Sequence, residues 1–235
     1  MEKIFTLTVM MFSFSGILLL GLEIPEELGE AYRFEYRVII IQNPLIWISY
    51  PAFIDLPNVD ALNAAVEKFV EEMWEKWKEE LAYAQKNLVK YHQQVDYYLT
   101  FEINWLSEDL VSIVFQDSAY TGGAHGQPSI KVFNYNLKRK RIIHLKDLFK
   151  EEVDYKRQIN EKVKKWLEYA LTIEEFETIK DDDQFSINRL GIEIILQVYE
   201  YTPYAYGSPR ILICYDELQG FNDWFLNVIK KGRWY

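Results

Sequence analysis

The sequence predicts an α+β fold, in which a mainly antiparallel sheet carries two long helices packed on one face. Several segments alternate apolar and polar residues with a period of two, which is typical of half-buried strands. Two longer segments place apolar residues three and four positions apart, which is typical of amphipathic helices. Helices that are confined to one face leave the opposite face of the sheet partly available.

The chain begins with an apolar segment, residues 4–21, which follows Lys3 and contains no ionised side chain. We interpret it as a signal peptide or an N-terminal membrane anchor. Its 18 residues are at the short end for a membrane span, for which about 20 are usual, and no clear cleavage motif follows. Both alternatives therefore stay open. The expected location is extracytoplasmic, either secreted or anchored to the cytoplasmic membrane by the N-terminus, with membrane contact only through residues 4–21 if they are not removed.

The next part of the chain predicts two strands and one long helix. Residues 32–41 alternate with a period of two, and residues 45–53 continue as a second strand. Pro51 places that strand at an edge or ends it, because proline cannot donate to a strand ladder. Helical spacing over 60–90 predicts the first long helix. Its apolar positions are Val66, Phe69, Val70, Met73, Trp77 and Leu81.

The middle of the chain predicts a hairpin over 95–116, interrupted by the sequence LSED. A further strand over 130–136 leads through the charged sequence LKRKR to a short extended segment at 142–145. Helical spacing over 154–170 then predicts the second long helix.

The C-terminal part predicts a short helix over 172–179, strands over 191–201 and 209–215, and a terminal helix over 217–231. The acidic sequence KDDDQFS before the first of these strands lacks the spaced ligands, central glycine and terminal glutamate of a calcium loop. We therefore expect no metal and no cofactor.

The composition limits the partners of the protein. The 36 acidic and 26 basic side chains give a formal net charge of −10, which repels phosphate backbones and excludes nucleic acid as an expected partner. Cys214 is the single cysteine, so an intramolecular disulfide cannot form.

Two adjacent glycines interrupt the strand pattern in the sequence YTGGAHG at residues 120–126. A phosphate-binding glycine loop needs a helix after it, whereas Pro128 and a strand pattern follow here. Gly122 and Gly123 are therefore predicted to form a structural turn that needs positive φ or a close backbone approach. Gly207 is predicted to do the same in a second turn.

His125 in this sequence could act as a general base or a zinc ligand, since both roles suit its ordinary pKa of about 6.5. Zinc would require at least three ligands, and His92, His125 and His144 show no ligand-pair spacing. We predict no catalytic residues and assign His125 to ligand contact or to ordering of the loop. The alternative is a hydrolase in which His125 is the general base, with Asp117 or Glu200 beside it.

A tyrosine-rich run, VYEYTPYAYGSPR at residues 198–210, is the second unusual segment. Tyrosine combines a large apolar ring with a polar tip, so a cluster on a loop favours recognition, although packing over the end of the sheet is the simpler alternative. The predicted ligand-binding residues in the two segments are Tyr120, Thr121, His125, Tyr201, Tyr204 and Tyr206.

The sequences YTGGAHG, FNYNL, HLKDLF and YEYTPYAYGSPRILICYDEL resemble an extracytoplasmic module of unknown function. That module occurs in the lysozyme-sensing anti-sigma-V factor and beside the catalytic domain of peptidoglycan deacetylase C. The sequence ISYPAFIDLPNVDALNAAVEKFV is similar to the companion module that precedes it in those proteins. The resemblance implies an α+β domain outside the cytoplasmic membrane, and in the anti-sigma factor that domain is a protein receptor.

The resemblance divides the chain into residues 1–21 as leader, 30–92 as the companion module and 93–235 as the GGAH-containing module, with the two modules forming one compact unit. We expect neither the sigma-binding part nor the deacetylase part of those proteins here. The predicted function is an exported or membrane-anchored, non-catalytic bacterial domain that binds an envelope-associated protein or a cell-wall saccharide. The alternative remains a hydrolase of cell-envelope polymers.

Overall fold

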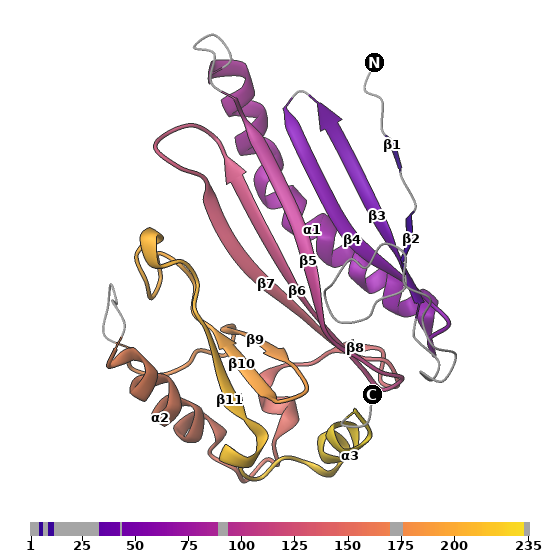
Figure 1. The fold of residues 1–235 in the computed structure, drawn as a ribbon, viewed down its shortest axis with the longest axis vertical. Coiled ribbons are helices and arrows are strands. Elements are labelled where there is room, and N and C mark those ends of the chain that lie inside the picture. The colour runs from indigo at the N-terminus through magenta and orange to yellow at the C-terminus, as the bar shows by residue number, and fades with distance from the viewer. Residues whose placement is uncertain are drawn as a thin grey trace, which may run out of the picture. The chain divides into compact units, whose positions relative to one another are not determined.

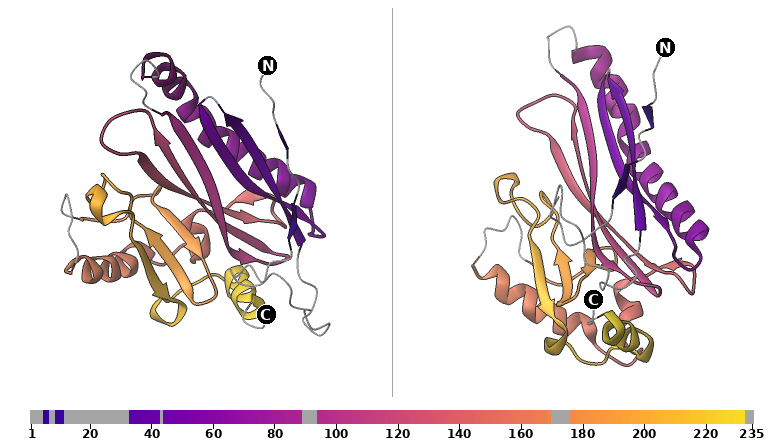
Figure 2. Two further views of the ribbon diagram at one scale, coloured as in Figure 1. Left: turned by 45° about the horizontal axis from the view of Figure 1, so that its top comes forward. Right: turned by 45° about the vertical axis from the view of Figure 1, so that its right-hand side comes forward.

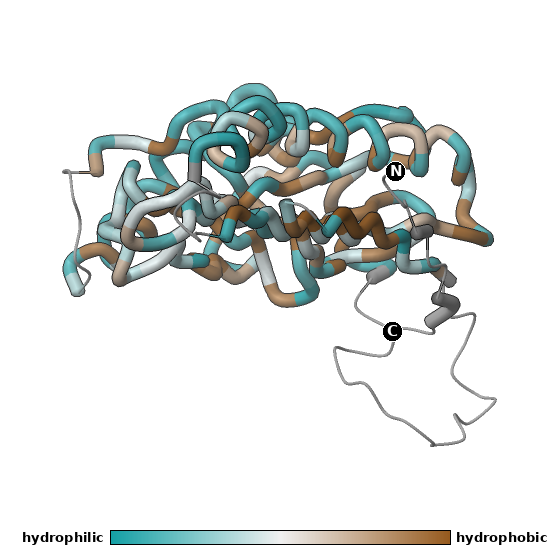
Figure 3. Tube along the Cα trace, turned by 90° about the horizontal axis from the view of Figure 1, so that it is seen from above, coloured by the Kyte–Doolittle hydropathy of each residue, from teal (hydrophilic) through white to brown (hydrophobic). Residues whose placement is uncertain are grey.

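A computed structural model describes residues 5–6, 9–11, 33–42, 44–88, 94–169 and 176–232. The chain divides into two compact units, which are described separately below. Unit 1 comprises Met1–Phe101, Ala119–Gly126 and Tyr235, and unit 2 comprises Glu102–Ser118 and Gln127–Trp234. Hydrophobic and hydrophilic residues alternate along much of the trace, as expected of elements with one buried side (Figure 3).

Unit 1 begins with a long antiparallel hairpin (Figure 1). Strand β3 (Arg33–Gln42) pairs with β4 (Leu45–Ile54) over their whole length. The short strands β1 (Phe5–Thr6) and β2 (Val9–Met11) pair antiparallel with β3. They belong to the apolar segment 4–21, and the rest of that segment lies outside the described residues.

Helix α1 (Val59–Leu88) connects β4 to β5 (Asp96–Leu106), which is parallel to β4. Parallel neighbours need a crossover connection, and α1 provides it by packing against β4 (Figures 1 and 2). Five of the six apolar positions predicted from the helical spacing are buried, whereas Phe69 is partly exposed. The buried side chains of α1 are Leu62, Val66, Val70, Met73, Trp77, Leu81 and Ala84.

Strands β6 (Leu110–Tyr120) and β7 (Gln127–Asn136) follow β5, and β8 (Arg141–Ile142) pairs with the end of β7. The hydrogen-bonded order of this sheet is β1-β3-β4-β5-β6-β7-β8, with β2 paired to β3. The hairpin predicted over residues 95–116 is therefore present, with β5 shifted by one residue and β6 extending to Tyr120.

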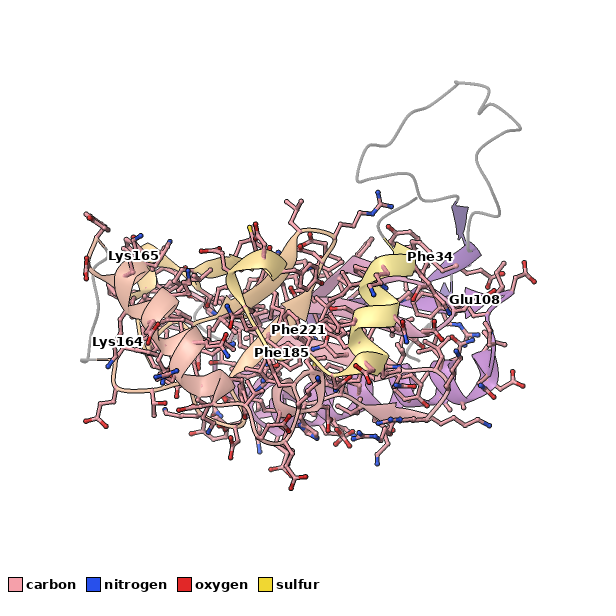
Figure 4. All side chains as sticks on the ribbon, turned by 90° about the horizontal axis from the view of Figure 1, so that it is seen from below. Phe34, Glu108, Lys164, Lys165, Phe185 and Phe221 are labelled. Atoms are coloured by element: carbon pink, nitrogen blue, oxygen red, sulfur yellow. The ribbon has the colours of Figure 1, made fainter. Side chains whose placement is uncertain are left out.

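Unit 2 contains a second, antiparallel sheet with the order β11-β10-β9. Its strands are β9 (Gln184–Ile187), β10 (Gly191–Ile195) and β11 (Arg210–Cys214). Helix α2 (Tyr155–Leu167) packs against β11, while Lys164 and Lys165 are exposed on its outer side (Figure 4). Helix α3 is Asp223–Gly232, and short 3₁₀ helices occupy Leu145–Leu148, Tyr204–Tyr206 and Tyr215–Glu217.

The core of unit 2 contains apolar side chains from these elements and the segments between them, including Phe185 and Phe221 (Figure 4). Strands supply Ile187, Ile192, Ile194, Ile211 and Ile213, and the helices supply Ile159, Val163, Phe225, Val228 and Ile229. Such burial is the main favourable contribution to folding.

The predicted α+β class, with a mainly antiparallel sheet, is confirmed. The two long helices were expected on one face of a single sheet. Instead, α1 packs on β4, and α2 packs on β11 of the smaller sheet. The strand predicted over 191–201 ends at Ile195. The short helix predicted over 172–179 is wrong for residues 176–179, which are not helical. The first part of that segment lies outside the described residues. His92 also lies outside them. Within the described ranges, every helix is too short or too polar to cross a membrane.

Candidate functional site

The GGAH segment forms the connection between β6 and β7, in unit 1. Gly122 and Gly123 have φ angles of 103° and 110°, which glycine adopts readily and other residues avoid. The Tyr120 hydroxyl donates to the carbonyl oxygen of Gly123 at 3.0 Å. The Thr121 hydroxyl donates to Glu80 Oε1 on α1, also at 3.0 Å. Tyr120 and Thr121 thus contribute hydrogen bonds that hold this turn.

His125 is exposed, and its Nδ1 lies 2.9 Å from the carbonyl oxygen of Gly126, which fits the tautomer with the proton on Nδ1. Asp117 belongs to unit 2, where its buried carboxylate accepts a hydrogen bond from the Ser129 hydroxyl on β7. The described part of the chain contains no group of three or more His, Cys, Asp or Glu side chains that could hold a metal ion. General-base catalysis by His125 remains a prediction.

The tyrosine-rich run forms the connection between β10 and β11, in unit 2. Tyr199, Tyr204 and Tyr206 are 50%, 41% and 41% exposed, and we call these three residues the tyrosine surface. The rings of Tyr199 and Tyr204 stack with centroids 6.1 Å apart, and Tyr206 meets Trp166 of α2 edge to face at 6.2 Å. The surface therefore combines apolar rings with hydroxyl groups.

Buried groups hold the tyrosine surface in place. Tyr201 was predicted to contact a ligand, but it is only 7% exposed and its hydroxyl donates to the Asp183 carboxylate at 3.1 Å. The fully buried Thr202 donates to the carbonyl oxygen of Gly207 at 2.5 Å. Tyr201 therefore packs inside and helps to hold the loop. Tyr199, two residues before it, is exposed and was not among the predicted ligand-binding residues.

Two residues of the loop have a positive φ angle. Gly207 has a φ of 71°, at the end of the 3₁₀ turn Tyr204–Tyr206. Tyr199 has a φ of 67°, which is costly for a residue with a large side chain. Strain of this kind persists only where the surrounding structure holds it, and here Val198 N–H donates to Ser208 Oγ at 3.0 Å and Tyr199 N–H to the Thr202 carbonyl at 2.8 Å.

Charged groups beneath the loop alter the local pKa values. Burial raises the pKa of the Asp183 carboxyl, while the Lys180 amide and the Tyr201 hydroxyl oppose that rise. Burial also raises the pKa of Tyr201, and the nearby Asp183 and Glu200 carboxylates raise it further. Lys180 pairs with Glu200, and its ammonium lies 5.3 Å from the centre of the Tyr201 ring.

A pocket of about 330 Å³ lies on unit 2, next to the segment that carries Lys180 and Asp183. Asp181, which lines the pocket, forms an ion pair with Lys156 at 2.6 Å. The lining of the pocket consists of His144, Leu145, Lys146, Tyr155, Lys180, Asp181 and Asp182. None of the predicted site residues lines this pocket.

The fold and these surfaces define an α+β module whose exposed aromatic side chains lie on a loop held by hydrogen bonds. Two family models match the chain. Residues 42–128 match the family described as deacetylase PdaC, and residues 146–216 match the family described as protein of unknown function (DUF3298). The chain therefore contains a module of the DUF3298/PdaC type, as its resemblance to the module beside peptidoglycan deacetylase C predicts.

One curated relative is the peptidoglycan-N-acetylmuramic acid deacetylase PdaC of Bacillus subtilis (strain 168). It is 33% identical to this chain over 110 residues, which are 46% of this chain and 22% of the relative. This chain therefore matches less than a quarter of the length of that relative.

Two solved structures share the fold. A DUF3298 family protein from Pseudomonas aeruginosa PAO1 has a TM-score of 0.57 and 18% identity, with 95% of each chain covered. A DUF3298 family member from Bacteroides fragilis NCTC 9343 has the same TM-score and identity, with 99% of this chain and 97% of that chain covered. At this identity, the similarity establishes the fold alone.

Proposed function

We propose that the protein is a non-catalytic, extracytoplasmic module that binds a cell-wall saccharide at the tyrosine surface. The observation that carries this proposal is the exposure of Tyr199, Tyr204 and Tyr206 on a loop that buried hydrogen bonds hold in one conformation. Rings that are already ordered lose little conformational entropy when a ligand binds, so more of the contact energy contributes to affinity.

The chemistry of the surface suits a saccharide. The apolar faces of sugar rings pack against aromatic rings, while their hydroxyl groups need hydrogen-bond partners. Tyrosine supplies both, since each ring carries a hydroxyl at its tip.

The relative supports the same ligand class and the same location. Its name states that it acts on the N-acetylmuramic acid of peptidoglycan, a polymer of the cell wall, and the two chains share a third of their residues over 110 positions. A module that holds this polymer would be useful beside a deacetylase and also in a separate chain. The apolar residues 4–21 fit export of the domain or its attachment to the membrane.

The test is calorimetric titration of the whole protein with soluble peptidoglycan fragments. We expect saturable binding that Tyr204→Ala or Tyr199→Ala each weakens by about tenfold, which corresponds to about 1.4 kcal/mol. Tyr83→Ala is the matched control, because Tyr83 is 72% exposed on α1 in unit 1. Absence of binding, or equal binding by the Tyr204 variant, would overturn the proposal.

Two further measurements separate the alternatives. If a purified envelope protein binds with the same dependence on Tyr204 while the fragments do not, the ligand is a protein and the saccharide assignment is wrong. Release of new reducing ends from the polymer by the wild-type protein, but not by His125→Ala, would show that the module is a hydrolase.

A further inference from the structure

A second aromatic surface lies in unit 1, on the face of the sheet opposite to α1. Helix α1 covers the face that carries Ile46, Ile48, Tyr97 and Leu99, all of which are buried, and Trp74 of α1 contacts Tyr97 with ring centroids 5.5 Å apart. Side chains alternate between the two faces of a strand, so Trp47 and Tyr98 point to the other face. They remain 38% and 40% exposed.

The strand register places these two aromatic residues side by side. Trp47 of β4 is the direct partner of Tyr98 in the parallel pair β4–β5, and of Ile40 in the antiparallel pair β3–β4. Ile40, Trp47 and Tyr98 therefore lie in one row, which continues to Phe5 of β1, the partner of Ile40. Neighbouring strands are about 4.8 Å apart, so the two rings make a continuous apolar strip.

Polar residues flank this row on both sides. The next row on one side runs from Gln42 through Leu45 to Asp96. On the other side, Thr100 follows Tyr98 by two positions on β5, so both side chains point to the same face. Gln42 and Thr100 are exposed, and Asp96 is partly exposed. The strip therefore has an amide, a carboxylate and a hydroxyl within reach of a ligand that lies on the rings.

The charges in these rows select the type of ligand. The two rows and Thr100 contain one acidic residue, Asp96, and no lysine or arginine, so an anionic ligand such as a phosphate or an anionic lipid would find no cation there. A wholly apolar partner would leave the amide, the carboxylate and the hydroxyl unpaired on binding, at a cost. A neutral ligand with an apolar ring face and many hydroxyl groups satisfies both the rings and the flanking groups.

We propose that Trp47 and Tyr98 form a saccharide-binding platform on unit 1, separate from the tyrosine surface of unit 2. The inference rests on the proposed function for its ligand class only. The sugar ring lies on the two aromatic rings, and Gln42, Asp96 and Thr100 bond its hydroxyl or acetamido groups. Hydrogen bonds hold the strands of the platform together, because the hairpin β3–β4 pairs over its whole length and the Ser49 hydroxyl donates to the Leu99 carbonyl at 3.1 Å.

The experiment is a nuclear magnetic resonance titration of the full chain, labelled with ¹⁵N, with the tetramer of N-acetylglucosamine as the probe. The indole N–H signal of Trp47 is identified by its loss in Trp47→Phe. We expect this signal to shift during the titration of the wild-type protein, and Trp47→Ala to weaken binding, measured at the Tyr98 amide, by about tenfold. Tyr98→Ala weakens binding measured at the Trp47 indole, and Tyr83→Ala leaves it unchanged.

The outcomes distinguish this inference from the proposed function. If the Trp47 signal shifts in Tyr204→Ala as it does in the wild-type protein, the platform binds independently, whether or not the tyrosine surface binds. A Trp47 signal that does not respond to the probe overturns the platform, and so does a response that disappears in Tyr204→Ala. Circular dichroism and thermal melting of each variant show whether a loss of binding comes from unfolding. If Trp47→Ala is unfolded, Trp47→Phe replaces it, because phenylalanine keeps an aromatic ring. Its binding is then measured at the Tyr98 amide signal.

Discussion

The side-chain amide of Gln197 pairs with the backbone of Ile130 as a neighbouring strand would. Its Nε2 donates to the Ile130 carbonyl oxygen at 2.7 Å, and its Oε1 accepts from the Ile130 N–H at 3.2 Å. Gln197 immediately precedes the tyrosine-rich run, so this pairing fixes the start of the loop to β7. In unit 1, Asn63 of α1 makes the same double contact with Phe53 of β4, at 2.8 Å and 2.9 Å.

Replacement of Gln197 by alanine should lower the free energy of unfolding by about 1–3 kcal/mol, because the Ile130 backbone loses both partners in a partly buried place. Urea denaturation measures this change. Gln116→Ala is the matched control, since Gln116 is exposed on β6, and it should change stability by less than about 0.5 kcal/mol. Equal stability of the two variants would show that the Gln197 pairing is unimportant.

Asp109 should make unit 2 sensitive to acid. Its side chain is only 8% exposed and lies 2.5 Å from Lys138 and 3.0 Å from Lys231. Burial acts to raise the pKa of this carboxyl, but the two lysines outweigh burial and hold it below its ordinary value. A carboxyl with a lowered folded pKa stabilises the fold above its unfolded pKa of about 3.9, and the contribution is lost as pH falls through the folded value.

We therefore expect Asp109→Asn to lower the free energy of unfolding by about 1–2 kcal/mol at neutral pH, since the exposed lysines weaken the effect, and by much less near pH 2. Denaturation at several pH values measures the difference. The neighbouring Glu108 is exposed (Figure 4), and Glu108→Gln should show no such trend. A difference between Asp109→Asn and the wild type that stays constant with pH would contradict the assignment.

Gly191 should tolerate no side chain. A Cβ atom at this position would lie 2.0 Å from the carbonyl oxygen of Ile213 on the paired strand β11. Gly191→Ala should therefore cost about 3 kcal/mol or more, because two backbones must separate. Gly123→Ala meets no atom within 4 Å and should cost only about 1–2 kcal/mol of backbone strain. Chemical denaturation ranks the two variants, and the reverse order would contradict the register of β10 and β11.

Tyr201→Phe should raise the pKa of Asp183 further, because the Tyr201 hydroxyl is one of the groups that oppose the effect of burial. A ¹³C titration of the carboxyl measures this change, and the exposed Tyr199→Phe is the control. The variant should also be about 1 kcal/mol less stable at neutral pH. That difference should narrow as pH falls through the folded pKa of Asp183, since the protonated carboxyl depends less on the hydroxyl. A pKa that stays the same would remove Tyr201 as a partner of Asp183.

The periodic parts of the sequence predicted the elements well. Helix α1 and strands β3 to β7 lie close to their expected bounds, because each has one buried side that repeats with the period of its element. Gly122, Gly123 and Gly207 were expected in turns, and all three have positive φ. The helix expected over residues 172–179 is absent from residues 176–179, where the Ile179 N–H bonds to the Asn160 side chain, a contact that no local pattern reveals.

The aromatic surfaces could be predicted only in part. The run of tyrosines was visible, but its burial pattern was not, since Tyr201 points to Asp183 while Tyr199 and Tyr204 face outward. Trp47 and Tyr98 were each part of an alternating strand, 51 positions apart in the sequence. They become neighbours only because β4 and β5 are parallel, with α1 as the crossover.

By itself, the sequence determined the class of the fold, the helix and strand periods, the glycine turns and the acidic charge, because these properties depend on residues that are close together in the chain. Only the tertiary structure decided which strands pair, which of the two sheets each helix covers, and which aromatic rings stay exposed. Strand register and burial depend on contacts between residues far apart in the sequence, and the free energy of those contacts has no local signature.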